Sequence, residues 1–142
     1  MRGGGPRPQL CQVVIDTTDV RRTAEFWRQL LGLVYREDHE PPPPGTPDTA
    51  GGEWLNLYEP DGTPRLAFQQ VPTLAPTTWP DHTVPQQLHL DLIVGSVDEL
   101  SEVHDRVLAL GGQLRFDRSD DPDEPLRVYA DPAGHTFCVF VA

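Results

Sequence analysis

The chain has 142 residues, enough for one domain with a buried core, and a formal net charge of −11 from 22 acidic and 11 basic side chains. This charge argues against nucleic acids and anionic membranes as partners, because both are bound by basic surfaces. Every basic residue is an arginine, so Schiff-base catalysis by lysine is excluded. Two cysteines without a CxxC spacing, a start rich in glycine and proline, and no apolar run of membrane-spanning length predict a cytoplasmic protein without disulfides.

The first half of the chain predicts a strand, a helix and three further strands. Alternating residues predict a strand over 10–16, with Cys11, Val13 and Ile15 on the core face. Apolar residues at helical spacing follow over 20–31, after capping residues and before Gly32, which suits a helix end. The remaining strands are expected at 33–40, 53–59 and 65–71.

The second half repeats this order after a proline-rich linker. In the strand over 87–94, alternate leucines face the core, whereas His89 and Asp91 share the opposite face. Ser96 and Glu99 form a capping box that starts a second helix. The apolar stripe of this helix is Val97, Leu100, Val103, Val107 and Leu110, and three strands follow at 113–117, 126–131 and 136–141.

The repeated order predicts an α+β fold made of two βαβββ modules. We expect a single domain over 9–142, with modules 9–72 and 86–142 joined by the linker 73–85. One module alone would leave unpaired strand edges. Two related modules can form a cup-shaped mixed sheet with the helices outside and the polar strand faces inside.

Three segments carry a resemblance to a known family: DVRRTAEFWRQLLG at 19–32, HLDL at 89–92 and DPAGHTFCVF at 131–140. Together with the repeated module, they resemble the vicinal oxygen chelate superfamily, and within it the bacterial glyoxalase-like domains of the bleomycin-resistance type. The resemblance implies a homodimer and a small-molecule ligand. It does not imply one reaction, because that scaffold hosts lyases, isomerases, dioxygenases and drug-sequestering proteins.

The resemblance also implies four metal positions, on the first and last strands of each module. In this chain they are Gln12, Gln69, His89 and Cys138. His89 fits the family pattern and Gln12 is acceptable, but Gln69 and Cys138 replace two carboxylates. Because hard divalent cations prefer anionic oxygen, the implied cofactor is either none or a weakly held zinc, nickel or manganese ion.

Strand alternation predicts which side chains line the cup. The predicted ligand-binding residues are Trp54, Asn56, Tyr58, Asp91, Arg127 and Tyr129. His89 is the predicted catalytic residue, as an acid or base whose tautomer Asp91 helps to fix. The structural alternative is that His89 and Asp91 only pair with each other and stiffen the strand.

Three functions stay open at this point. The first is a cytoplasmic protein that binds a small apolar or aromatic metabolite or antibiotic and acts on it through His89. The second is a metal-dependent lyase or isomerase of the glyoxalase type, and the third is a drug-binding resistance protein without catalysis.

Overall fold

A computed structural model describes residues 4–142, and the first module has the predicted order of elements. Its elements are β1 (Val13–Thr17), α1 (Val20–Leu31), β2 (Val34–Tyr35), 3₁₀ turns at Glu37–His39 and Ala50–Gly52, β3 (Trp54–Tyr58) and β4 (Pro64–Gln70). The strands form a sheet in the order β1-β4-β3-β2, with β1 parallel to β4 and the other pairs antiparallel.

The second module repeats this topology. Its elements are β5 (Leu90–Val94), α2 (Val97–Ala109), β6 (Gln113–Arg118), β7 (Leu126–Ala130) and β8 (Thr136–Val141). The sheet order is β5-β8-β7-β6, and again the first and last strands are parallel. The predicted α+β fold of two βαβββ modules is therefore confirmed, as two four-stranded sheets that do not close into a barrel.

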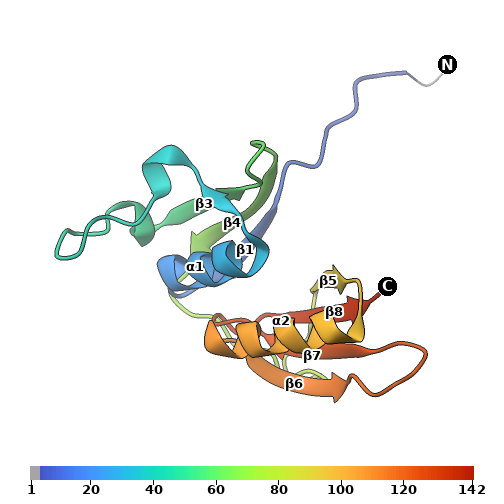
Figure 1. The fold of residues 1–142 in the computed structure, drawn as a ribbon. Helices are drawn as coiled ribbons and strands as arrows, with labels where there is room; N and C mark the ends of the chain where they lie inside the picture. The colour runs from blue at the N-terminus through green and yellow to red at the C-terminus, as the bar shows by residue number, and fades with distance from the viewer. Residues whose placement is uncertain (1–3) are drawn as a thin grey trace.

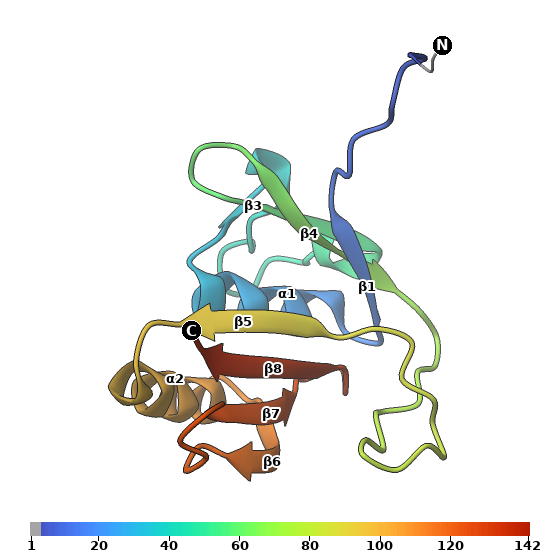
Figure 2. The same cartoon turned by 90° about the vertical axis from the view of Figure 1, so that its right-hand side faces the viewer.

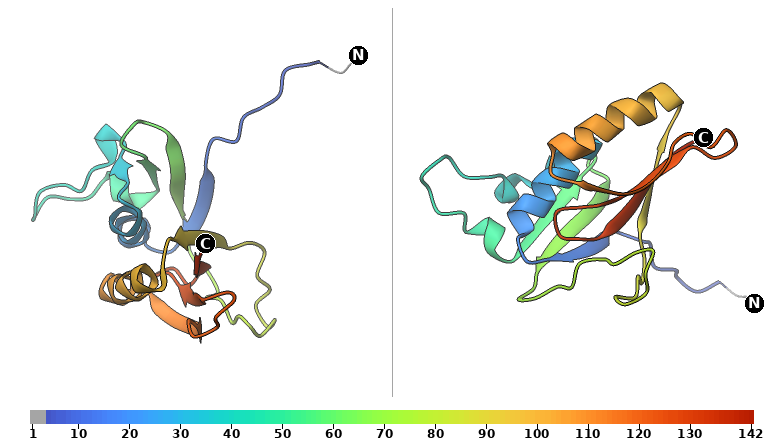
Figure 3. Two further views of the ribbon diagram at one scale, coloured as in Figure 1. Left: turned by 45° about the vertical axis from the view of Figure 1, so that its right-hand side comes forward. Right: turned by 90° about the horizontal axis from the view of Figure 1, so that it is seen from below.

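The two helices lie beside one another on one side of the sheets (Figure 1). The Arg106 guanidinium of α2 donates to the Gln29 carbonyl of α1 at 2.6 Å. Figure 2 shows β5 crossing in front of α1, and Figure 3 shows the two sheets meeting at an angle. The opposite faces of the sheets are therefore free of helices.

One core runs through both modules. The α1 side chains Phe26 and Trp27 pack against Phe137 of β8, with ring centroids 5.8 and 4.9 Å apart. Tyr129 of β7 stacks on the same Phe137 ring at 5.3 Å. These side chains are essentially inaccessible to solvent, so each module completes the core of the other.

The helix boundaries follow the predicted capping chemistry. The Asp19 side chain accepts from Arg22 N at the start of α1, and Gly32 ends the helix in a left-handed conformation, φ 68°. Ser96 accepts from Glu99 N at the start of α2. Among the described residues, no helix is long and apolar enough to cross a membrane.

Several local expectations were wrong. The strand predicted over 33–40 is only two residues long, because the chain turns at Glu37–His39 before the prolines. Cys11 is exposed and precedes β1. Leu88 and Val97, expected in the core, are 67% and 53% exposed because each lies just outside or at the start of its element.

Candidate functional site

The helix-free face of the first sheet holds a hydrogen-bonded chain of one indole and two side-chain amides. Trp54 Nε1 donates to Asn56 Oδ1 at 2.8 Å, and Asn56 Nδ2 donates to Gln12 Oε1 at 3.2 Å. Gln69 is exposed and lies opposite Trp54 in the β3–β4 pair. Tyr58, at the end of β3, is half-buried. The polar groups of this face thus largely satisfy one another.

The helix-free face of the second sheet brings an imidazole, a carboxylate and a thiol together. His89 Nε2 lies 3.1 Å from Asp91 Oδ1, and both side chains are exposed. Cys138 of β8 is the register partner of Asp91. Ligand atoms of His89, Asp91 and Cys138 all lie within 4.8 Å of one another. Burial, together with the nearby Asp91 charge, raises the pKa of the Cys138 thiol, so the thiol holds its proton at neutral pH.

Two predicted ligand-binding residues lie on the other side of the sheet. Tyr129 is fully buried beneath α2, and its hydroxyl is 2.9 Å from His104 Nδ1. Burial raises the pKa of Tyr129 to about 12. Arg127 pairs with Asp117 at 3.3 Å and donates to the Leu100 carbonyl at 3.4 Å. The predicted face was wrong for both, because alternation shows which residues share a face but not which face the helix covers.

A cavity of about 510 Å³ lies where the two modules meet. β1 contributes Val14 and Asp16, the linker contributes Leu74, the approach to β5 contributes His89, and the turn before β8 contributes His135. His135 Nε2 is 2.6 Å from the Asp16 carbonyl oxygen, which joins the modules at the cavity wall. The linker therefore forms part of a cavity wall beside His89.

The linker is held in this position by bonds to the second module. Thr77 N donates to the Gly134 carbonyl at 2.8 Å, and Thr136 Oγ1 donates to Thr77 Oγ1 at 2.8 Å. A Cβ atom at Gly134 would stand 2.7 Å from Pro76 Cβ, so the close approach of the linker requires glycine there.

The four implied metal positions are divided between the two sheets, two in each. Gln12 is engaged with Asn56, and Gln69 belongs to the same first sheet, whereas His89 and Cys138 belong to the second module. Asp91, predicted as a ligand-binding residue, joins His89 and Cys138 instead. Imidazole, carboxylate and thiol donors fit zinc better than they fit a hard cation such as magnesium.

Comparison with known proteins agrees with the fold. A model of the glyoxalase-like domain matches residues 12–140, and the chain belongs to this family, within the vicinal oxygen chelate superfamily. No protein of curated function matches the sequence.

Solved structures of low sequence identity share the fold over nearly the whole chain. A glyoxalase/dioxygenase from Nostoc punctiforme is 19% identical, with a TM-score of 0.66 and coverage of 99% of this chain and 98% of that one. A glyoxalase/bleomycin resistance protein/dioxygenase family enzyme from Burkholderia phytofirmans is 14% identical, with a TM-score of 0.62 and coverage of 92% and 96%. The fosfomycin resistance protein FosX from Listeria monocytogenes is 14% identical, with a TM-score of 0.65 and coverage of 96% and 95%.

Sequence reasoning missed two parts of this region. His135 was not among the predicted site residues, although it lines the cavity and contacts Asp16. The linker residues next to His89 carried no signal beyond proline content, because their place depends on contacts such as Thr77 with Gly134.

Proposed function

We propose that the protein binds a small, partly apolar or aromatic molecule in the 510 Å³ cavity and that His89 acts on it as an acid or base. The observation that carries the proposal is the position of His89, which lines the cavity while its Nε2 is 3.1 Å from Asp91. A cavity of this volume with an apolar wall and few polar groups is typical of small-molecule sites.

The contacts of the imidazole define its part in the chemistry. Asp91 can only accept, so the His89 Nε2–H donates to it, which leaves Nδ1 as the basic nitrogen. The Gln86 side-chain nitrogen is 3.3 Å from Nδ1 and donates to it in this tautomer. A ligand that displaces the exposed Gln86 amide would present its own proton to Nδ1. Asp91 would stabilise the imidazolium that forms.

The first test is a ligand screen on the full chain. Fosfomycin and bleomycin, taken from the names of similar proteins, and a library of small aromatic fragments are screened by ligand-observed NMR. Hits should shift the backbone amide signals of His89, Leu90 and Thr136, which line the cavity. Hits whose shifts fall only elsewhere would contradict the proposal, as would a screen without hits.

Variants then separate binding from chemistry. His89→Ala should weaken binding of a hit about tenfold or more and abolish any turnover, because a hydrogen-bonded base is lost. Asp91→Asn should lower turnover more than affinity. His82→Ala is the matched control, since His82 lies in the linker and does not line the cavity. Equal effects of the two histidine substitutions would refute a specific role for His89.

The His89, Asp91 and Cys138 cluster favours a second candidate function, a metal-dependent lyase or isomerase. These three side chains would hold zinc, and a bound zinc ion would supply Lewis-acid polarisation of a substrate oxygen. Chelator-treated protein soaked in zinc, nickel or manganese should then retain about one ion per chain, and Cys138→Ala should abolish retention. If no stoichiometric ion is retained after soaking, the metal-dependent function fails and the His89 proposal stands.

A further inference from the structure

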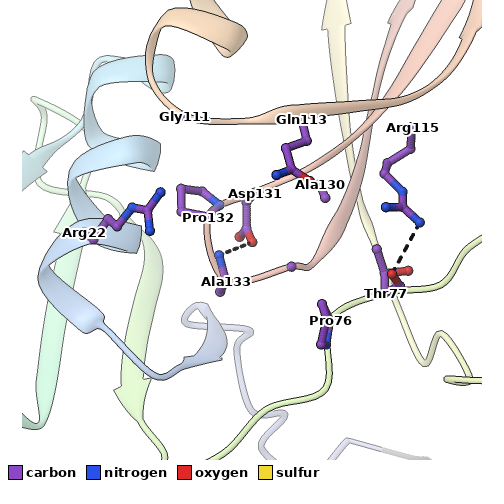
Figure 4. A pocket seen from close by; sticks show the side chains of 11 residues that line it. Arg22, Pro76, Thr77, Gly111, Gln113, Arg115, Ala130, Asp131, Pro132 and Ala133 are labelled. Atoms are coloured by element: carbon purple, nitrogen blue, oxygen red, sulfur yellow. Dashed lines mark hydrogen bonds between the residues drawn. The ribbon is translucent and has the colours of Figure 1, made fainter.

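A second cavity, of about 340 Å³, lies at the other side of the linker contact and shares only Thr77 and Gly134 with the cavity beside His89 (Figure 4). The first turn of α1 contributes Arg22, and β6 contributes Gln113 and Arg115. Thr77 of the linker and the turn at residues 131–134 complete the wall. The cavity is thus built by both modules and the linker.

Two arginines of this cavity lack an acidic partner in a strongly acidic protein. Among residues 4–142, six arginines form ion pairs with carboxylates: Arg21, Arg28, Arg36, Arg65, Arg118 and Arg127. The described arginines outside these pairs are Arg7, Arg22, Arg106 and Arg115. Two of those four, Arg22 and Arg115, line this one cavity.

Their side-chain nitrogens are also weakly engaged with the protein. Arg115 Nη2 makes only long contacts, 3.4 Å each, to the carbonyl oxygens of Thr77 and Trp79. The Arg22 guanidinium has no hydrogen-bond acceptor among the described residues. Figure 4 shows the two side chains reaching the cavity from opposite sides, Arg22 from α1 and Arg115 from β6. Both residues are exposed, so their donors are available to a ligand in the cavity.

The acidic group of the same cavity is turned to other partners. Asp131 is 3% exposed, and its Oδ2 accepts from Trp27 Nε1 at 2.9 Å. Its Oδ1 accepts from the backbone N–H groups of Ala133 and His135, both at 2.9 Å. Burial raises the pKa of this carboxyl, and both of its oxygens already accept hydrogen bonds from the protein.

We propose that this cavity binds a small dianion, a phosphate or a dicarboxylate, between Arg22 and Arg115. Guanidinium groups bind oxyanions through paired N–H donors, and the two lie here without competing carboxylates. Gln113 and the Thr77 hydroxyl add neutral polar groups to the wall. Because Arg22 belongs to the first module and Arg115 to the second, a bound dianion would bridge the modules and stabilise their contact.

The test uses the full chain and two probes, inorganic phosphate and succinate, at ionic strength held constant with chloride. Isothermal titration calorimetry should give saturable binding of at least one probe. The backbone amide signals of Gly111, Gln113 and Ala133, which line this cavity and not the one beside His89, should shift along the titration. Preference for phosphate or for succinate identifies the ligand class, and either result supports the proposal.

Arg22→Gln and Arg115→Gln should each weaken binding about tenfold or more, as expected for the loss of a charged hydrogen-bond partner. Arg106→Gln is the matched control, because Arg106 also lacks an acidic partner but does not line the cavity. Binding of the probes in the Arg106 variant should equal that of the parent protein.

Three outcomes would overturn the proposal: no saturable binding of either probe, equal affinity in the parent and both cavity variants, or equal loss in the control. Arg22 also lies near Gly111, at the C-terminal end of α2. If Arg22 serves only that helix end, Arg22→Gln lowers the melting temperature in chloride and leaves the affinity for the probes unchanged. This site is independent of His89, so failure here leaves the proposed function untouched.

Discussion

The two modules share one topology but bury their sheets to different extents. In the first module, residues 55–57 of β3 and 66–68 of β4 are all buried, which means that both faces of the sheet are covered there. In the second module, residues 128–130 of β7 are buried in the same way, but the edge strands are open: five of the six residues of β6 are exposed, and β5 alternates between half-buried and exposed residues. The helices differ in the same way, since α1 buries five residues and α2 only Leu100 and Val107.

The two modules also differ in their polar side chains: those of the first module bond to one another, whereas those of the second remain exposed. The Trp54 indole and the side-chain amides of Asn56 and Gln12 are joined by hydrogen bonds in the first module. In the second module, His89 and Asp91 remain exposed beside Cys138. The first module in turn lends Trp27 to the core of the second, so the more open module is not built to stand alone.

The sharpest test of this dependence is Trp27→Ala. The substitution removes a fully buried indole that packs on Phe137 and donates to Asp131, so we expect the free energy of unfolding to fall by about 3–5 kcal/mol. Urea denaturation, followed by far-UV circular dichroism, measures the loss. If the modules depend on each other, unfolding stays a single transition; two separate transitions would break the comparison.

Trp79→Ala is the control for the size of the residue. Trp79 lies in the linker and is half-buried, and its ring meets the exposed Phe116 ring edge-on at 6.0 Å. Its loss should cost about 1 kcal/mol or less. If the two substitutions lower the free energy of unfolding equally, the contact between the modules contributes no more to stability than the contact in the linker.

Asp131→Asn tests the polar half of the same contact. The asparagine side chain places an N–H₂ group where a carboxylate oxygen accepted, either from Trp27 Nε1 or from the N–H groups of Ala133 and His135. A buried donor is left facing a donor, which should cost about 1–3 kcal/mol at neutral pH. Urea denaturation measures the loss, and a cost below a few tenths of a kcal/mol would contradict this account.

The pH dependence of the Asp131 effect has a defined sign. Burial raises the pKa of Asp131 above its ordinary 3.8, so the folded state holds this proton more tightly than the unfolded state. The contribution of Asp131 is fully present below pH 3.8 and is lost as pH rises through the folded pKa. The stability difference between parent and variant should therefore be largest in acid and decrease toward neutral pH.

The fold could be predicted because its signals are local. Asp19 and Ser96 cap the two helices through their own neighbours, and alternation in the strands is visible within a few residues. The prediction failed where tertiary contacts decide which face of a strand is covered. Nothing in the strand containing Tyr129 shows that its aromatic face turns to α2 and Phe137 rather than to the open side.

The candidate site could be predicted only in part for the same reason. His89 and Asp91 share a strand face, so their pairing was visible in the sequence. Cys138 was placed beside them only through the resemblance, and the Trp27–Asp131 bond spans 104 residues. The linker wall and the arginine pair at 22 and 115 arise from three segments that meet only in the folded chain.

The smallest expected effect concerns the loop at residues 37–52, which belongs to the more buried module. Arg21 of α1 holds this loop through Asp48 at 2.7 and 2.9 Å and through the His39 carbonyl at 2.8 Å. Asp48→Asn should lower the free energy of unfolding by about 1 kcal/mol, because the pair is bidentate but only partly buried.

The hydrogen bond from Arg21 lowers the pKa of Asp48, so this stabilisation is present above pH 3.8 and is lost as pH falls through the folded pKa. The variant should lack that acid-side loss in urea denaturation, whereas Asp38→Asn, at the mostly exposed Arg36 pair, should change the free energy of unfolding by a few tenths of a kcal/mol at most. If both substitutions behave alike, the Arg21 pair does not stabilise the loop. The greater burial of the first module would then not depend on this contact.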